Sequence, residues 1–201
     1  MLYELSINRA GRAQRVTRDG RMYLVAPITL LVPGVLNGSQ GPLYYPPDEV
    51  ARDPKAWNGT PITIGHPVRN GRPVSASSPG VVAVGRVFNA TADGSLRAEG
   101  WFDVEATRRA DPRLLAALEA GRRVEVSTGL FTMNHPAPAG SVHNGRPYVA
   151  VARSFRPDHL AVLLDVPGAC SVADGCGVNV HNGHVEPPLT PPSLFGSGRA
   201  V

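Results

Sequence analysis

The chain has 201 residues, and its 22 glycines and 20 prolines make up about a fifth of all positions, well above the average share. Glycines and prolines at this density exclude coiled coils and bundles of long helices. A hydrophobic fraction of 42% with 18% charged residues is enough to fill a core and excludes global disorder. The net charge of +4, from 20 basic and 16 acidic residues, is too small to imply nucleic acid as a partner.

The sequence contains no candidate membrane helix or convincing signal peptide. Its most apolar stretch, residues 22–36, is shorter than the roughly 20 residues that a membrane helix needs, and it contains two prolines. The two cysteines, Cys170 and Cys176, are too few to stabilise a chain of this size through disulfide bonds. We therefore expect the protein in a reducing cytoplasm.

Asn-Gly and Asp-Gly pairs, which accept the positive φ angles of tight hairpin turns, recur along the chain. Residues 14–18 and 21–25 flank Asp19-Gly20 and predict a first hairpin. Residues 81–88 and 96–104 flank Asp93-Gly94 and predict a second. Ten of the prolines fall between residues 27 and 79, which predicts a loop-rich region with a short helix near residues 48–52.

One helix is well marked. Asp111 can cap it, Pro112 suits its first position, the leucines that follow have helical spacing, and Gly121 ends it. A short helix near residues 104–109 is expected before it. Alternating residues 124–130 predict a half-buried strand, and two further strands are predicted at 148–152 and 159–164.

Residues 1–178 are therefore predicted to form one mainly β, β-rich α+β domain. From His181 onward the composition changes to Pro, Gly, Ser and His, so residues 179–201 are predicted to form a disordered tail.

Three polar residues on otherwise apolar segments are candidates for chemistry. His66 follows Ile62 and Ile64 on one face of a short strand, although a lone histidine before a turn is more often structural. His159 opens a strongly apolar strand and needs a hydrogen-bond partner or a chemical role.

The third candidate is Ser127, which faces away from Val126 and its apolar neighbours. Gly129 lies on the same face and would leave room for a substrate, and Thr128 is a competing nucleophile. A serine hydroxyl needs a base to take its proton, and the base works best when a third group orients it. The three residues could supply these roles.

A set of motifs in this order resembles the prohead maturation proteases of tailed phages. The motifs are GTPITIGHP (59–67), VSTG (126–129), NGRPY (144–148) and PDHLAVL (157–163), followed by GACSVADGC (168–176). The likeness spans about residues 27–178 and is closest to the branch with GHP, S-x-G and HLA signatures. That family is related to the herpesvirus capsid protease.

The resemblance implies a serine endopeptidase with His66 as general base, Ser127 as nucleophile and His159 as the orienting third member. It also implies a small closed or partly closed β-barrel with a few flanking helices. The implied substrates are phage scaffold and major capsid proteins, and the chain itself near its tail, inside an assembling prohead in the bacterial cytoplasm. High local concentration there favours a homodimer or a larger oligomer. No cofactor, catalytic metal, membrane or nucleic acid is expected.

The family resemblance leaves two assignments open. Other prohead proteases use an acidic third member, so Asp158 or Asp165 could share or take the role given to His159. The oxyanion donors are equally open, with backbone N–H groups of the turn at residues 144–148, or a nearby arginine (Arg153 or Arg156), as candidates.

Two alternatives to a serine protease follow from other features. Cys170, Cys176, His181 and His184 are zinc-type ligands, but the spacing of the cysteines is unusual and the histidines lie in the predicted tail. A catalytic metal site formed by three histidines, His66, His143 and His159, is a less favoured alternative than this zinc site. The other alternative is a non-enzymatic, capsid-associated or scaffold-binding module with a protease-like fold.

Overall fold

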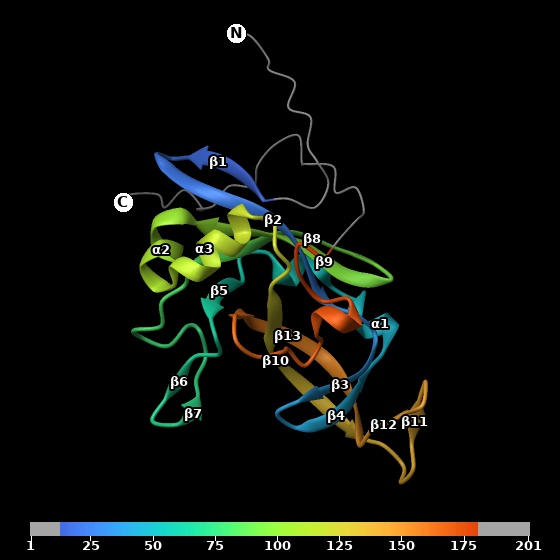
Figure 1. The fold of residues 1–201 in the computed structure, drawn as a ribbon. Helices are drawn as coiled ribbons and strands as arrows, with labels where there is room; N and C mark the ends of the chain where they lie inside the picture. Colours follow the sequence, from blue (N-terminus) through green and yellow to red (C-terminus); the bar gives the residue numbers. More distant parts are fainter. Residues whose placement is uncertain (1–12, 181–201) are drawn as a thin grey trace, which may run out of the picture.

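The computed structural model describes residues 13–180, which form a mainly β α+β fold with one large mixed sheet of ten strands and three α-helices (Figure 1). The β-rich class predicted from the sequence is confirmed. No helix within these residues is long and apolar enough to cross a membrane. All but the first two residues of the predicted tail lie outside the described residues. The strands are β1 (Gln14–Arg18), β2 (Arg21–Leu31), β3 (Gly34–Gly38), β4 (Gly41–Tyr45), β5 (Pro61–Ile64), β6 (Val68–Arg69), β7 (Arg72–Pro73), β8 (Gly85–Asp93), β9 (Ser95–Asp103), β10 (Glu125–Pro136), β11 (Val142–His143), β12 (Arg146–Pro147), β13 (Ala150–Leu163) and β14 (Gly177–Val178); the helices are α1 (Pro47–Val50), α2 (Val104–Ala110) and α3 (Pro112–Glu119), with short 3-10 helices at Pro54–Trp57 and Val172–Asp174.

The large sheet runs in the order β1-β2-β9-β8-β5-β13-β4-β3, with β10 paired to β13 and β14 paired to β2. Its ladders are antiparallel except those of β13 with β4 and β5, which are parallel. Among residues 13–180, the ladders between these strands do not close into a barrel. An isolated bridge joins Val124, just before β10, to Val178 in β14, with backbone hydrogen bonds of 3.2 and 2.9 Å.

Both predicted hairpins are present. β1 and β2 pair up to Arg18 and Arg21 around Asp19-Gly20, as expected. In the second hairpin the strands are shifted along the chain, because β8 begins only at Gly85 and pairs with β9 up to Asp93 and Ser95. A register shift between residues 88 and 91, where Asn89 has a φ of 53°, accompanies this longer arm.

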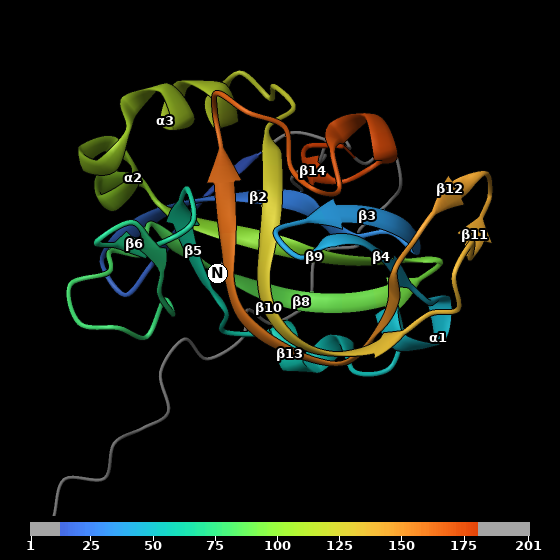
Figure 2. The ribbon, with the colours of Figure 1, turned by 90° about the horizontal axis from the view of Figure 1, so that it is seen from below.

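The two predicted helices of the central region are also confirmed, and they lie together at one end of the sheet (Figure 2). Asp103 caps α2 by accepting the N–H of Ala106, and Asp111 caps α3 by accepting that of Arg113. α3 buries its leucines against the sheet, and the chain leaves it through Gly121, which has a φ of 65°.

The prediction of a loop-rich region between residues 27 and 79 is wrong for much of that region. β2 continues through Pro27 to Leu31, and the β3–β4 hairpin and β5 follow. A proline interrupts a helix, but its φ is compatible with an extended chain where no ladder bond is needed from its nitrogen. The expected short helix is present as α1.

The predicted strands at 148–152 and 159–164 are parts of a single strand, β13. β13 pairs with β10 almost throughout, and the two strands form a long, bent ribbon (Figure 2). Register shifts near Ser154, which has a φ of 55°, mark the bend. The charged and proline-containing residues between the two apolar runs therefore belong to an irregular strand and not to a loop.

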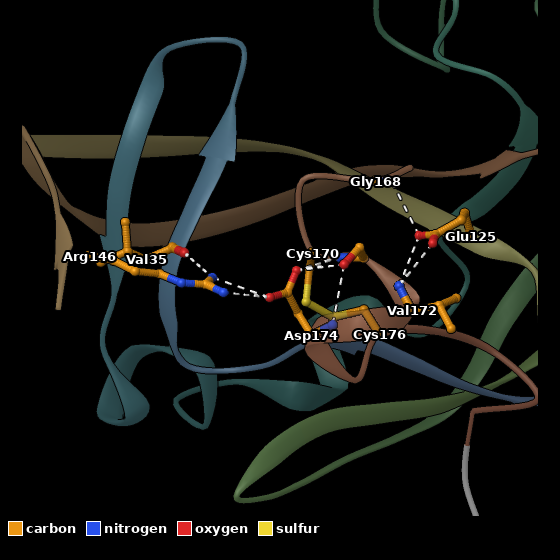
Figure 3. The surroundings of a disulfide bond; sticks show 9 residues. Val35, Glu125, Arg146, Gly168, Cys170, Val172, Asp174 and Cys176 are labelled. Atoms are coloured by element: carbon orange, nitrogen blue, oxygen red, sulfur yellow. Dashed lines mark hydrogen bonds and ion pairs between the residues drawn. A yellow bond between two sulfur atoms is a disulfide. The ribbon is translucent and has the colours of Figure 1, made fainter. Parts of the chain in front are cut away.

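A disulfide bond joins Cys170 and Cys176 in the segment that follows β13 (Figure 3). The default of a reducing compartment did not anticipate this bond. Glu125, at the start of β10, accepts backbone N–H groups from Gly168 and Val172, at 3.0 to 3.2 Å. The disulfide segment is thereby fastened to the strand that carries Ser127.

Reduction of this disulfide is expected to lower the free energy of unfolding by about 2 kcal/mol, because the bond closes a short loop and restricts the unfolded chain. For a chain of this length, that corresponds to a fall in Tm of roughly 4–8 °C. Thermal unfolding followed by circular dichroism, with and without a reductant, measures the change. The double variant Cys170→Ala, Cys176→Ala should not respond to the reductant, and an equal Tm for oxidised and reduced wild type would contradict the prediction.

Candidate active site

Three neighbouring strands bring His66, Ser127 and His159 to one cavity. β13 lies between β5 and β10, in parallel with the first and antiparallel to the second. In the β10–β13 ladder, Ser127 is opposite Ala161 and Gly129 is opposite His159. Directly opposed residues share a face, so Ser127 and His159 project to the same side of this ribbon.

His66 reaches His159 because the chain turns sharply after β5. Gly65 has a φ of 68°, a region that favours glycine, and the hydroxyl of Thr63 donates a hydrogen bond of 2.8 Å to the carbonyl of Gly65. The register places Ile64 opposite Val162, and the turn then brings the imidazole of His66 back to the level of His159.

A series of hydrogen bonds runs from His66 into the protein. The Nδ1 atom of His66 lies 2.8 Å from Nε2 of His159, and Nδ1 of His159 lies 2.7 Å from Oδ2 of Asp158. A carboxylate can only accept, so Nδ1 of His159 donates to Asp158 and its Nε2 accepts from Nδ1 of His66. The Nε2 atom of His66 is then left without a proton, which is the state that a general base needs.

The carboxylate of Asp158 is itself held by the loop after β7. The hydroxyl of Ser75 donates to Oδ1, and the backbone N–H of Ala76 donates to Oδ2 at 2.9 Å. Burial raises the pKa of Asp158, but the hydrogen bonds from Ser75, Ala76 and His159 outweigh it, so the pKa lies below its ordinary value. Asp158 is therefore ionised at neutral pH.

His66 is exposed to solvent at the mouth of the cavity, but its environment still opposes protonation. Burial lowers the pKa of His66 from its ordinary value, and the nearby His159 lowers it further. The neutral ring thus prevails at neutral pH, in agreement with the tautomer that the hydrogen bonds impose.

Ser127 lines the same cavity as both histidines, Asp158 and Ser75. The cavity has a volume of about 390 Å³. Six consecutive residues of β10, from Ser127 to Thr132, line it. The cavity therefore extends along this part of β10.

Gly129 was expected to leave room for a substrate, but the side chain next to it is that of His159. A Cβ atom at this position would lie 2.1 Å from Cε1 and 2.3 Å from Nδ1 of His159. The space beside Gly129 is thus filled by the imidazole of His159, and a side chain here would push that ring out of its hydrogen bonds.

Of the other sequence-based candidates, Asp158 lines the cavity and contacts His159 but not His66, and the rest lie elsewhere. Asp165 pairs with Arg113 at 3.0 Å. Arg153 pairs with Asp48, and Arg156 lies over the ring of Phe131. Neither arginine, nor any residue of the turn at 144–148, is among the described residues lining the cavity.

The candidate metal sites are not assembled in the described part of the chain. Cys170 and Cys176 are bonded to each other, and the proposed partners His181 and His184 fall outside residues 13–180. His143 stacks on Tyr44, with ring centroids 4.4 Å apart, and is not in the cavity with His66 and His159. Over residues 13–180, no group of three or more His, Cys, Asp or Glu side chains could hold a metal ion.

Sequence reasoning missed Ser75 and Ala76. They lie in a loop of small polar residues, and nothing in their spacing relates them to Asp158, more than 80 positions away. Comparisons of the chain with protein-family models, curated proteins and solved structures find no match. The function of the site is therefore inferred from its geometry.

Proposed function

We propose that this chain is a serine endopeptidase in which Ser127 is the nucleophile, His66 the general base, and His159 the residue that orients the base. The observation that carries the proposal is the hydrogen-bonded series from His66 through His159 to Asp158, which begins in the cavity that Ser127 lines. Such a series fixes the tautomer of the base and leaves it ready to accept a hydroxyl proton.

The reaction then follows the usual course of acyl transfer. The proton of Ser127 passes to Nε2 of His66 while Oγ attacks the peptide carbonyl carbon. The amine product leaves with that proton, and water, deprotonated by the same ring, hydrolyses the acyl-enzyme. The positive charge that develops on His66 is stabilised through His159 by the carboxylate of Asp158. A neutral imidazole alone would stabilise this charge less well than a carboxylate does.

The edge of β10 favours a peptide as the substrate. An extended chain can add to an exposed strand edge through main-chain hydrogen bonds, and β13 is the only ladder partner of β10 among the described strands. A scissile carbonyl on such a chain would lie beside Ser127. This placement supports an endopeptidase over a hydrolase of small esters.

The sequence motifs extend the proposal to biology. His66, Ser127 and His159 belong to the GHP, S-x-G and HLA motifs that resemble tailed-phage prohead proteases, and these motifs lie together at the cavity. We propose scaffold and major capsid proteins as the substrates, within the assembling prohead. We also propose that the curved sheet corresponds to the small barrel of that family, joined at the bridge between Val124 and Val178.

Co-expression with the scaffold and capsid proteins of the same phage tests this function. The expected result is shortened scaffold or capsid protein by intact mass, together with a fluorophosphonate adduct that peptide mapping places on Ser127. A folded chain that binds these proteins but neither cleaves them nor reacts with the fluorophosphonate would refute the protease and favour the non-enzymatic module.

The pH dependence offers an independent test. His66 must be neutral to accept a proton, and its pKa is lowered by burial and by His159. Activity should therefore persist as the pH falls, and be lost only below the ordinary histidine pKa of about 6.5. The acid limb of kcat/KM, measured between pH 4 and 9 on a peptide substrate, reports this value for the free enzyme. A midpoint above pH 7 would rule out His66, with its lowered pKa, as the base.

A further inference from the structure

The inner part of the cavity beside Ser127 is lined by apolar side chains. Leu31, Leu36, Leu43 and Tyr45 come from β2, β3 and β4, and all four are buried. Leu130 and Phe131 of β10 line the cavity as well. This wall is thus made of side chains from four strands, which hold it in shape.

The described lining of the cavity contains few ionisable groups. Apart from Tyr45, the titratable groups in the described lining are His66, Asp158 and His159, and all three are engaged in the hydrogen-bonded series. No arginine, lysine or glutamate of residues 13–180 lines the cavity. A charged side chain placed among the leucines would lose its hydration without gaining a partner.

A hydrogen bond beyond Thr132 connects two elements that border the cavity. The side chain of Asn134 donates a hydrogen bond of 2.7 Å to Oε1 of Gln40, which ties the β3–β4 turn to β10 beyond Thr132. Cys170, which forms the disulfide with Cys176, and its neighbour Ala169 contribute to the lining. The whole cavity, including the part beside His66 and Ser75, has a volume of about 390 Å³, which is at the lower end of ligand pockets, and its apolar part is suited to one large side chain.

We infer that this apolar space is a specificity subsite that takes a large aliphatic or aromatic side chain of the substrate, next to the scissile bond. The inference rests on the proposed function, since Ser127 defines where the scissile bond lies. Each methylene that a hydrophobic pocket gains or loses changes kcat/KM by about 10-fold to 200-fold. Leucine or phenylalanine should therefore be preferred to alanine, and lysine and aspartate should be rejected.

Peptidyl diphenyl phosphonates that differ only in the side chain on the phosphonate carbon test the subsite. In their reaction, the Oγ of Ser127 bonds to phosphorus, phenoxide leaves, and the hydroxyl proton passes by way of His66 to give phenol. Intact mass gives the rate of adduct formation. The leucine or phenylalanine compound should react at least tenfold faster than the alanine compound, and the lysine and aspartate compounds more slowly than alanine.

Two variants of the lining sharpen the test. Leu36→Phe should reduce the space and lower the ratio of the phenylalanine rate to the alanine rate, and Leu43→Ala should raise it. Leu118→Ala, which removes an equally buried leucine from α3 outside the cavity, should leave the ratio unchanged. Because the ratio is measured on one protein, a smaller folded fraction affects both rates equally.

The outcomes separate the subsite from the proposed function. Equal rates for all side chains, or fastest reaction with lysine or aspartate, would overturn the subsite while Ser127 remains the nucleophile. Absence of any adduct on Ser127 in folded protein would overturn the serine mechanism, and the subsite with it.

Discussion

Replacing Ser127 by alanine is expected to lower kcat/KM for a peptide substrate by a factor of about 10⁴ or more, because no acyl-enzyme can form without the hydroxyl. The fold should persist, since Ser127 joins the β10–β13 ladder through its backbone, opposite Ala161. The measurement is the rate of peptide cleavage, with circular dichroism as the check on folding.

Thr128 provides the matched control. Thr128 also lines the cavity, but it is opposite Leu160 in the ladder, so its side chain points to the other face of the ribbon. Thr128→Ala should keep activity within a few-fold of wild type. Full activity in Ser127→Ala, or its loss in Thr128→Ala alone, would transfer the role of nucleophile to Thr128.

The base should act together with the nucleophile as one unit. His66→Ala should cost nearly as much as Ser127→Ala, and the double variant should be little worse than either single variant. Additive losses would mean that His66 contributes by a route that does not pass through the hydroxyl of Ser127.

The sequence predicted local features of this fold well, because they depend on neighbouring residues. Capping by Asp111, the stop at Gly121 and the turn at Asp19-Gly20 are all encoded within a few positions. Long strands were harder to predict. β13 looked like two strands, since its bend at Ser154 depends on its pairing with β10 and on a hydrogen bond from the backbone N–H of Ser154 to Glu49, which is distant in the sequence.

The site shows the same division. His66, Ser127 and His159 could be selected as polar residues on apolar strands, but their meeting in one cavity depends on the order β5-β13-β10. Gly129 was singled out for the right property, the lack of a side chain, but the structure gives that space to the ring of His159. No pattern in the sequence indicated that the loop with Ser75 and Ala76 would hold Asp158.

Removing the carboxylate of Asp158 is expected to lower kcat by about 10-fold to 100-fold, the cost known for metal-binding histidines that lose the group orienting them. In Asp158→Ala, Nδ1 of His159 loses its acceptor, and either ring nitrogen of His159 can then carry the proton. When the proton moves to Nε2, His159 donates to Nδ1 of His66 and forces the proton of His66 onto Nε2. The base is then blocked.

Asp158→Asn separates this tautomer effect from the effect of charge. The N–H of Ala76 points at Oδ2, so the asparagine oxygen should take that position and continue to accept from His159, while its NH₂ group faces the hydroxyl of Ser75. If tautomer control dominates, Asp158→Asn should lose less than about tenfold in kcat and remain well above Asp158→Ala. Ring-nitrogen chemical shifts of His66 and His159 by NMR would report the tautomers directly. Equal losses in the two variants, with the tautomers unchanged, would assign the effect to the negative charge, whose work is to stabilise the imidazolium of His66 in the transition state.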